Sequence, residues 1–130
     1  MTKLRILAAD DNAFFLEKVV LLLAAEFEVV ATAADGESAL ALIHRFQPDV
    51  VVLDLHMPKL NGLEITRELG RHSPSPPIVI CTLETDPDMA QAAREAGAIG
   101  YVLKTRLTKD LIRAVKSAAQ GKAFFPPTHR

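Results

Sequence analysis

The sequence predicts an α/β protein built from five consecutive strand–helix units, a doubly wound (βα)5 fold with helices on both faces of a parallel sheet. Two observations predict this class. Short apolar runs rich in valine and isoleucine alternate five times with longer segments whose apolar residues recur at helical spacing. The runs VVVLD at 50–54 and IVIC at 78–81 do not alternate in polarity, which is typical of strands buried on both faces. A chain of 130 residues suits one such domain.

The predicted elements follow one another with short connections. The strands are expected at residues 4–9, 28–33, 50–54, 77–82 and 100–103. The apolar stripes of the helices between and after them consist of Phe15, Leu16, Val19, Leu22 and Leu23; Ala39, Leu40, Leu42 and Ile43; Leu63, Ile65, Thr66 and Leu69; Met89, Ala92, Ala93 and Ala96; and Leu111, Ile112, Val115, Ala118 and Ala119. Gly97 and Gly121 are expected to stop the last two helices.

The composition excludes several classes of protein. Fifteen basic and 16 acidic residues give a formal charge of −1, which is unlike a basic nucleic-acid binder. The single Cys81 cannot form an internal disulfide, and no N-terminal stretch has the pattern of a signal peptide. No apolar run approaches the roughly 18 residues of a membrane span. We therefore expect a cytoplasmic protein that does not enter the membrane.

Polar residues stand where the predicted strands end. Asp10 and Asp11 follow the first strand, Asp54 ends the third, Thr82 ends the fourth and Lys104 follows the fifth. Ligands of open α/β sheets bind outside the carboxyl ends of the strands, so these side chains are expected at one edge of the sheet. The site therefore combines three carboxylates, a hydroxyl and an ammonium group.

This combination suggests chemistry on a phosphoryl group. Three neighbouring carboxylates repel one another and call for a cation, and all-oxygen ligands suit magnesium, with manganese as an alternative. The metal ion and Lys104 would neutralise phosphoryl charge, while Thr82 would donate a hydrogen bond to one phosphoryl oxygen. Asp54 is best placed to act as the nucleophile and to form an acyl phosphate.

The same positions resemble a known family, the receiver domains of bacterial two-component response regulators. The similarity rests on the acidic pair at 10–11, the D-x-x-M-P-x-x-x-G run at 54–62, Thr82, and Tyr101 three residues before Lys104. It covers residues 3–121 and implies a flavodoxin-like fold with strand order 2-1-3-4-5. The segment GAIGYVLK and a last helix ending in AVKSAAQGKAFFPP resemble NarL/FixJ-type transcription regulators.

The resemblance implies a role for each site residue. Asp54 would accept a phosphoryl group from a histidine kinase or a phosphotransfer protein. Asp11, Asp54 and the backbone carbonyl of His56 would hold the magnesium ion, with Asp10 nearby and acting through water. The domain would catalyse only its own phosphorylation and dephosphorylation.

The resemblance also implies how the signal leaves the site. Thr82 and Lys104 would bind the phosphoryl oxygens, and Tyr101 would rotate inward as Thr82 is drawn to the phosphate. The product would be a conformational signal that controls an output, such as transcription.

The chain departs from the family pattern at Leu83 and Thr105, and His56 and Glu84 would flank the phosphoryl group. Leu83 stands where the family usually has a small residue, and it could restrict access to the site. His56 and Glu84, two residues past Asp54 and Thr82, are expected to tune hydrolysis of the phosphoryl bond. Thr105 replaces a proline that many receivers carry in a cis bond, and a cis bond before threonine costs about 3 kcal/mol.

Residues 1–123 are expected to form the receiver domain, and 124–130 a tail or the start of a linker. Nucleic acid would be contacted only through an output domain outside this sequence, and phosphorylation could cause homodimerisation. A stand-alone receiver or a phosphorelay intermediate is the alternative.

Three further interpretations stay open at this point. Asp10 and Asp11 could simply cap the first helix. A magnesium-dependent phosphatase with an aspartyl nucleophile is disfavoured, because that class has an acid–base carboxylate where this chain has His56. A receiver that has lost phosphorylation and only binds other proteins is disfavoured by the complete acidic set.

Overall fold

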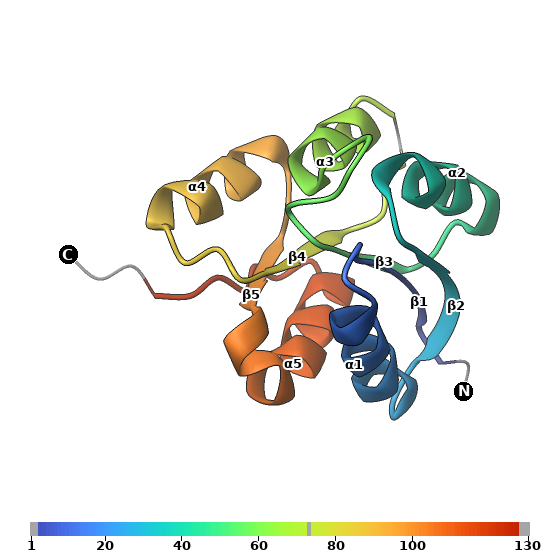
Figure 1. The fold of residues 1–130 in the computed structure, drawn as a ribbon, viewed down its shortest axis with the longest axis horizontal. Helices are drawn as coiled ribbons and strands as arrows, with labels where there is room; N and C mark the ends of the chain where they lie inside the picture. Colours follow the sequence, from blue (N-terminus) through green and yellow to red (C-terminus); the bar gives the residue numbers. More distant parts are fainter. Residues whose placement is uncertain (1–2, 73, 128–130) are drawn as a thin grey trace.

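Five parallel strands form one sheet in the computed structural model, which describes residues 3–72 and 74–127 (Figure 1). The strands are β1 (Arg5–Ala9), β2 (Glu28–Ala33), β3 (Val50–Leu53), β4 (Ile78–Thr82) and β5 (Gly100–Leu103). Their order in the sheet is β2-β1-β3-β4-β5, which confirms the predicted order. Because β1 and β3 are neighbours, the residues that follow Ala9 and Leu53 leave the sheet side by side.

Helices cover both faces of the sheet, as predicted (Figure 1). One face carries α1 (Ala13–Ala24) and α5 (Leu107–Ala119), and the other carries α2 (Gly36–Phe46), α3 (Gly62–Gly70) and α4 (Pro87–Ala96). Two separate clusters of buried apolar side chains result, one on each side of the sheet. A single turn of 3-10 helix, Lys104–Arg106, joins β5 to α5.

Burial follows the sequence pattern of the strands. Every residue of β3 and β4 is buried, in agreement with their unbroken apolar sequences. β2 is an edge strand and keeps several residues partly or fully exposed. The central strands therefore form a rigid, apolar support that ends abruptly in polar residues, and this arrangement positions the site.

Side-chain caps fix where several helices begin. The side chain of Asn12 accepts a hydrogen bond from the backbone N–H of Phe15 at the start of α1. The suggestion that Asp10 or Asp11 caps this helix is therefore wrong, because α1 begins one residue too late for Asp11 and two residues too late for Asp10. Asn61 and Glu64 form a reciprocal capping box at the start of α3.

The segment after α5 returns to the edge of the sheet. The backbone N–H of Phe124 donates to the carbonyl of Ile99 over 2.9 Å, and the N–H of Tyr101 donates to the carbonyl of Phe124 over 2.8 Å. The ring of Phe125 stacks on that of Tyr101, with centroids 6.5 Å apart. The domain boundary at residue 123 stays a prediction, but Phe124 and Phe125 pack against β5. Residues 128–130 of the expected tail lie outside the described residues.

Candidate functional site

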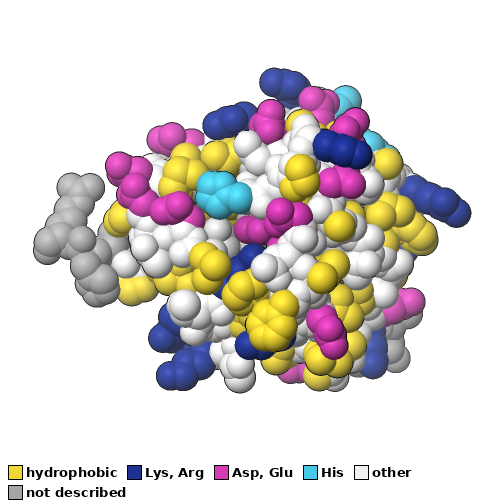
Figure 2. All heavy atoms as spheres, viewed as in Figure 1, with side chains coloured by type: hydrophobic (Ala, Val, Ile, Leu, Met, Phe, Trp, Pro, Cys, Tyr) yellow, Lys and Arg dark blue, Asp and Glu magenta, His cyan; other side chains and the backbone are white. Residues whose placement is uncertain are grey.

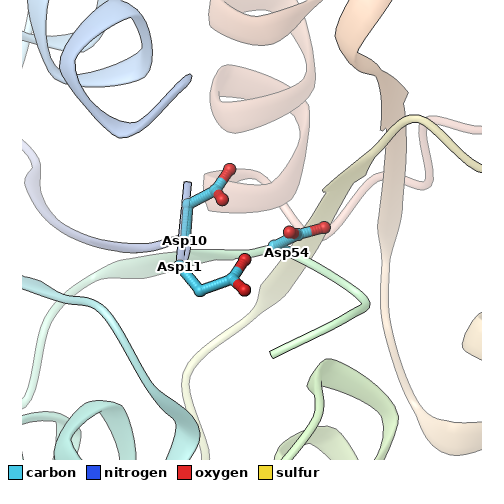
Figure 3. A group of neighbouring side chains, drawn as sticks. All are labelled: Asp10, Asp11 and Asp54. Carbon is cyan, nitrogen blue, oxygen red and sulfur yellow. The ribbon is translucent and has the colours of Figure 1, made fainter. Parts of the chain in front are cut away.

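Three carboxylates meet at the carboxyl ends of β1 and β3 (Figure 3). Asp10 and Asp11 are consecutive residues after β1, and Asp54 follows β3. One oxygen from each of the three carboxylates lies within 4.8 Å of the others. Asp10 and Asp54 are buried, at 4% and 6% exposure, whereas Asp11 is exposed. The cluster is thus anchored in the protein and open to solvent on the side of Asp11.

Lys104 reaches this cluster from the end of β5. Its Nζ lies 2.7 Å from Oδ2 of Asp10 and 3.3 Å from Oδ2 of Asp54. Its side chain is only 4% exposed. The structure therefore brings Asp10, Asp11, Asp54 and Lys104 together from three strands, as the strand-end argument predicts. The Lys104 ammonium group also bridges the buried carboxylates of Asp10 and Asp54 directly, which the sequence did not predict.

Burial and neighbouring charges shift the pKa values of both Asp54 and Lys104. Burial, followed by the charge of Asp10, raises the pKa of Asp54, although Lys104 partly offsets this effect. Burial on its own would lower the pKa of Lys104, but the hydrogen bond to Asp10 and the charges of both carboxylates raise it overall. The raised pKa of Lys104 favours its charged ammonium form, whereas the raised pKa of Asp54 means that burial makes its charged carboxylate less favourable than in water.

We expect Asp54→Asn to stabilise the metal-free protein at neutral pH. A carboxyl group with a raised folded-state pKa favours folding at pH values below its unfolded pKa, and this contribution is lost as the pH rises through the folded pKa. Removing the charge should therefore raise the free energy of unfolding at pH 7 and have little effect near pH 3. Urea denaturation of both proteins over this range in the presence of a chelator measures the difference. A difference that does not depend on pH contradicts the assignment.

Thr82 and Tyr101 are connected through one residue. Thr82 is buried at the end of β4, and its Oγ1 accepts a hydrogen bond of 3.1 Å from the backbone N–H of Glu84. The hydroxyl of Tyr101 donates to the backbone carbonyl of the same Glu84 over 2.9 Å. Tyr101 already lies in the inward position that the expected rotation would produce, at 2% exposure, and burial raises its pKa to about 12. The backbone of Glu84 is thus a link between the two side chains, which sequence reasoning missed.

The loop after Asp54 is held at several backbone positions. The N–H of Gly62 donates to the carbonyl of Leu55 over 3.0 Å, and the N–H of Gly36 donates to that of Pro58 over 3.2 Å. A Cβ on Gly62 would lie 2.4 Å from the backbone oxygen of Asp54, so only glycine allows α3 to approach the site this closely. The role of the His56 carbonyl as a metal ligand stays a prediction.

The residues expected to tune hydrolysis follow the ends of β3 and β4. Nε2 of His56 is 3.8 Å from Oε2 of Glu84, and the His56 side chain is 67% exposed. Leu83 is also exposed, at 56%. These side chains reach solvent from the ends of β3 and β4. Their effect on the phosphoryl bond stays a prediction.

The donor set fits a hard divalent cation. Asp10, Asp11 and Asp54 supply carboxylate oxygens as ligands. Among the described residues, these three side chains lie close enough together to share one ion. The outward exposure of Asp11 gives an ion access from solvent. Sulfur and imidazole ligands, which favour zinc, are not part of the group.

Comparison with known proteins identifies a family whose fold and site fit this structure. The model of the response regulator receiver domain matches the chain over residues 6–116. The chain belongs to this family. The receiver domain is 39% identical over 127 residues to the transcriptional regulatory protein DegU of Brevibacillus brevis, covering 96% of this chain and 54% of DegU. It is a signalling domain of the type found in NarL- and LuxR-type regulators.

Solved structures of other receivers have the same fold. The signal receiver domain of NarL from Mycobacterium tuberculosis has a TM-score of 0.90 and 30% identity, with 94% of this chain and 100% of that chain covered. A LuxR-family response regulator from Aurantimonas sp. SI85-9A1 also has a TM-score of 0.90, with 33% identity and coverage of 97% and 91%. The receiver spans about half the length of the curated relatives it matches. None of its helices in the described ranges is long and apolar enough to cross a membrane.

Proposed function

We propose that the receiver accepts a phosphoryl group on Asp54 from the phosphohistidine of a histidine kinase or a phosphotransfer protein. The observation that carries this proposal is the position of Asp54, buried at the end of a central strand, with Asp10, Asp11 and Lys104 gathered around it. A carboxylate that reacts as a nucleophile needs nearby cationic charge to offset the charge of the incoming group. Lys104 supplies part of that charge from within the chain.

The chemical step is an in-line displacement at phosphorus. An oxygen of the ionised Asp54 carboxylate forms the new bond, the phosphorus–nitrogen bond of the donor breaks, and its electron pair returns to the histidine ring. Lys104 then exchanges its contact with Asp54 for one with a phosphoryl oxygen, and Thr82 donates its hydroxyl to a second oxygen. We infer that Asp10, Asp11 and Asp54 hold a magnesium ion together with the His56 carbonyl. The ion supplies positive charge that offsets the charge of the carboxylates and the phosphoryl group.

The link through Glu84 supports a route for the signal. When the Thr82 hydroxyl turns toward the phosphoryl group, it gives up the N–H of Glu84, and the loop that carries the Glu84 carbonyl is free to move. That carbonyl accepts the hydroxyl proton of Tyr101, so the position of Tyr101 changes with the loop. Tyr101 contacts Phe125 in turn, which carries the change to the end of the domain.

We further propose that the receiver controls transcription as part of a longer protein. The relatives it matches are named as transcriptional regulators, and they extend well beyond the matched region. Residues 124–130 would begin the connection from a receiver domain at 1–123 to an output domain that binds DNA. Homodimerisation after phosphorylation is one way in which the receiver could act on such a domain. His56, Leu83 and Glu84 would set how quickly water removes the phosphoryl group.

Magnesium and a small phosphodonor such as acetyl phosphate test the acceptor function directly. We expect the intact mass of the wild-type protein to rise by one phosphoryl group, and the mass of Asp54→Asn to stay unchanged. Omission of magnesium should abolish the change. Equal labelling of both proteins would contradict the role of Asp54. Turnover of a supplied small phosphate ester, with release of phosphate, would favour a phosphatase instead.

A further inference from the structure

One contact of Lys104 has no part in the roles described above. Its Nζ lies 4.4 Å from the centroid of the Phe15 ring, near the start of α1. The two residues come from opposite ends of the chain, and their contact places an aromatic ring beside the ammonium group. Phe15 is half-buried, whereas the Lys104 side chain is almost fully buried. The ammonium group is therefore enclosed by two carboxylates and one aromatic ring.

An aromatic face suits this position for a physical reason. It attracts a cation through its negative electrostatic potential, and the attraction is stronger where water is excluded. A ring makes no directional hydrogen bond with the ammonium group, so the N–H donors stay available to oxygen ligands on the other side. A third carboxylate here would hold the ammonium more tightly but would repel an incoming phosphoryl group. Phe15 can therefore fix the location of the charge without occupying its donors.

We propose that Phe15 is a positioning residue for phosphoryl acceptance, and that its ring holds the Lys104 ammonium where it meets the phosphoryl oxygen. The proposal rests on the proposed function and concerns a residue that takes no part in the chemistry. Phe15 acts through Lys104, so its effect on phosphoryl acceptance requires the Lys104 ammonium group. A leucine at this position fills similar apolar space but lacks the aromatic face.

The neighbouring residue provides a matched control. Phe14 is on the same helix, is 66% exposed, and meets Phe15 edge to face with centroids 5.6 Å apart. Its own cation contact is with Lys18, at 5.5 Å, and not with Lys104. Figure 2 shows hydrophobic side chains gathered in the lower centre of this face, over α1, with Lys and Arg side chains to their left. Phe14→Leu therefore makes the same chemical change in the same region without removing the ring over Lys104.

The test measures two properties of the wild type, Phe15→Leu, Phe15→Tyr and Phe14→Leu. The first is the affinity for beryllium fluoride in the presence of magnesium, followed by NMR. We expect Phe15→Leu to bind about tenfold more weakly, while Phe15→Tyr and Phe14→Leu stay close to the wild type. The second is the chemical shift of the Lys104 Cε protons without ligand. Loss of the ring current should shift them in Phe15→Leu only.

A double variant separates positioning from a general effect on folding. In a Lys104→Met background, Phe15→Leu should cause no further loss of affinity, because its effect acts through the missing ammonium group. An additional loss of the same size in that background overturns the proposal, as does wild-type affinity in the Phe15→Leu single variant. If the wild type itself binds no beryllium fluoride, the proposed function fails. If the wild type binds beryllium fluoride and Phe15→Leu binds it equally well, the function stands and the role of Phe15 is wrong.

Discussion

Lys104→Met is expected to slow phosphoryl acceptance strongly while strengthening the binding of magnesium. The ammonium group lies 2.7 Å from Asp10 and 3.3 Å from Asp54, so it competes with a metal ion for both carboxylates. Without it, the acidic cluster is more negative and attracts a divalent cation more strongly. The transferring phosphoryl group, however, loses the cation that would bind one of its oxygens. We expect labelling by acetyl phosphate to fall by about a hundredfold or more.

The same substitution should destabilise the protein when no metal is bound. Removing one partner of a buried ion pair leaves uncompensated charge, at a typical cost of about 3 kcal/mol. Magnesium should restore most of this loss, since it replaces the missing positive charge. Magnesium titration and urea denaturation of Lys104→Met, beside the exposed control Lys109→Met, measure both effects. Weaker magnesium binding in Lys104→Met than in the control contradicts the account.

Gly62→Ala is expected to destabilise the receiver and to disturb the site. The added Cβ would lie 2.4 Å from the backbone oxygen of Asp54 and 3.1 Å from the Cα of Leu55. Neither backbone atom can turn away as a flexible side chain could, so α3 or the end of β3 must move. Such overpacking typically costs about 1–3 kcal/mol. Because the displaced segment carries Asp54, labelling by a small phosphodonor should fall together with stability.

The other end of the same helix provides the control for Gly62→Ala. A Cβ on Gly70 meets nothing within 4 Å, and alanine is favoured over glycine in a helix by about 1 kcal/mol. Gly70→Ala should therefore have equal or higher stability and should be labelled at the wild-type rate. Thermal denaturation and intact-mass kinetics on the two variants make the comparison. Equal stability of both variants would show that the close approach of Gly62 to Asp54 has no energetic consequence.

Much of the fold follows from patterns that act locally along the chain. Unbroken apolar runs such as 50–53 are stable only between two layers of helices, and this requirement alone predicts buried parallel strands. The site could be predicted for a related reason. Parallel strands bring their carboxyl ends to one edge, so Asp10, Asp54 and Lys104 had to lie near one another once the strands were recognised.

Other features depend on distances that the sequence does not contain. The ring of Phe15 fits the pattern of an apolar helix position, and only the tertiary structure, in which α1 packs against α5, brings it to Lys104. Thr82 and Tyr101 are linked through the backbone N–H and carbonyl of Glu84, so the identity of the residue at position 84 could not predict the link. The cap of α1 by Asn12 was missed because three neighbouring residues, 10–12, all have side chains able to cap a helix.

The central claim is that Asp54 is the phosphoryl acceptor, and the position of the label tests it most directly. The wild-type receiver is incubated with magnesium and acetyl phosphate and then reduced with borohydride, which converts an aspartyl phosphate into a stable homoserine. Peptide mass spectrometry then locates the converted residue. The account predicts conversion at Asp54 alone, dependent on magnesium. Conversion at Asp10 or Asp11, or a label on a histidine with Asp54 unchanged, would contradict it.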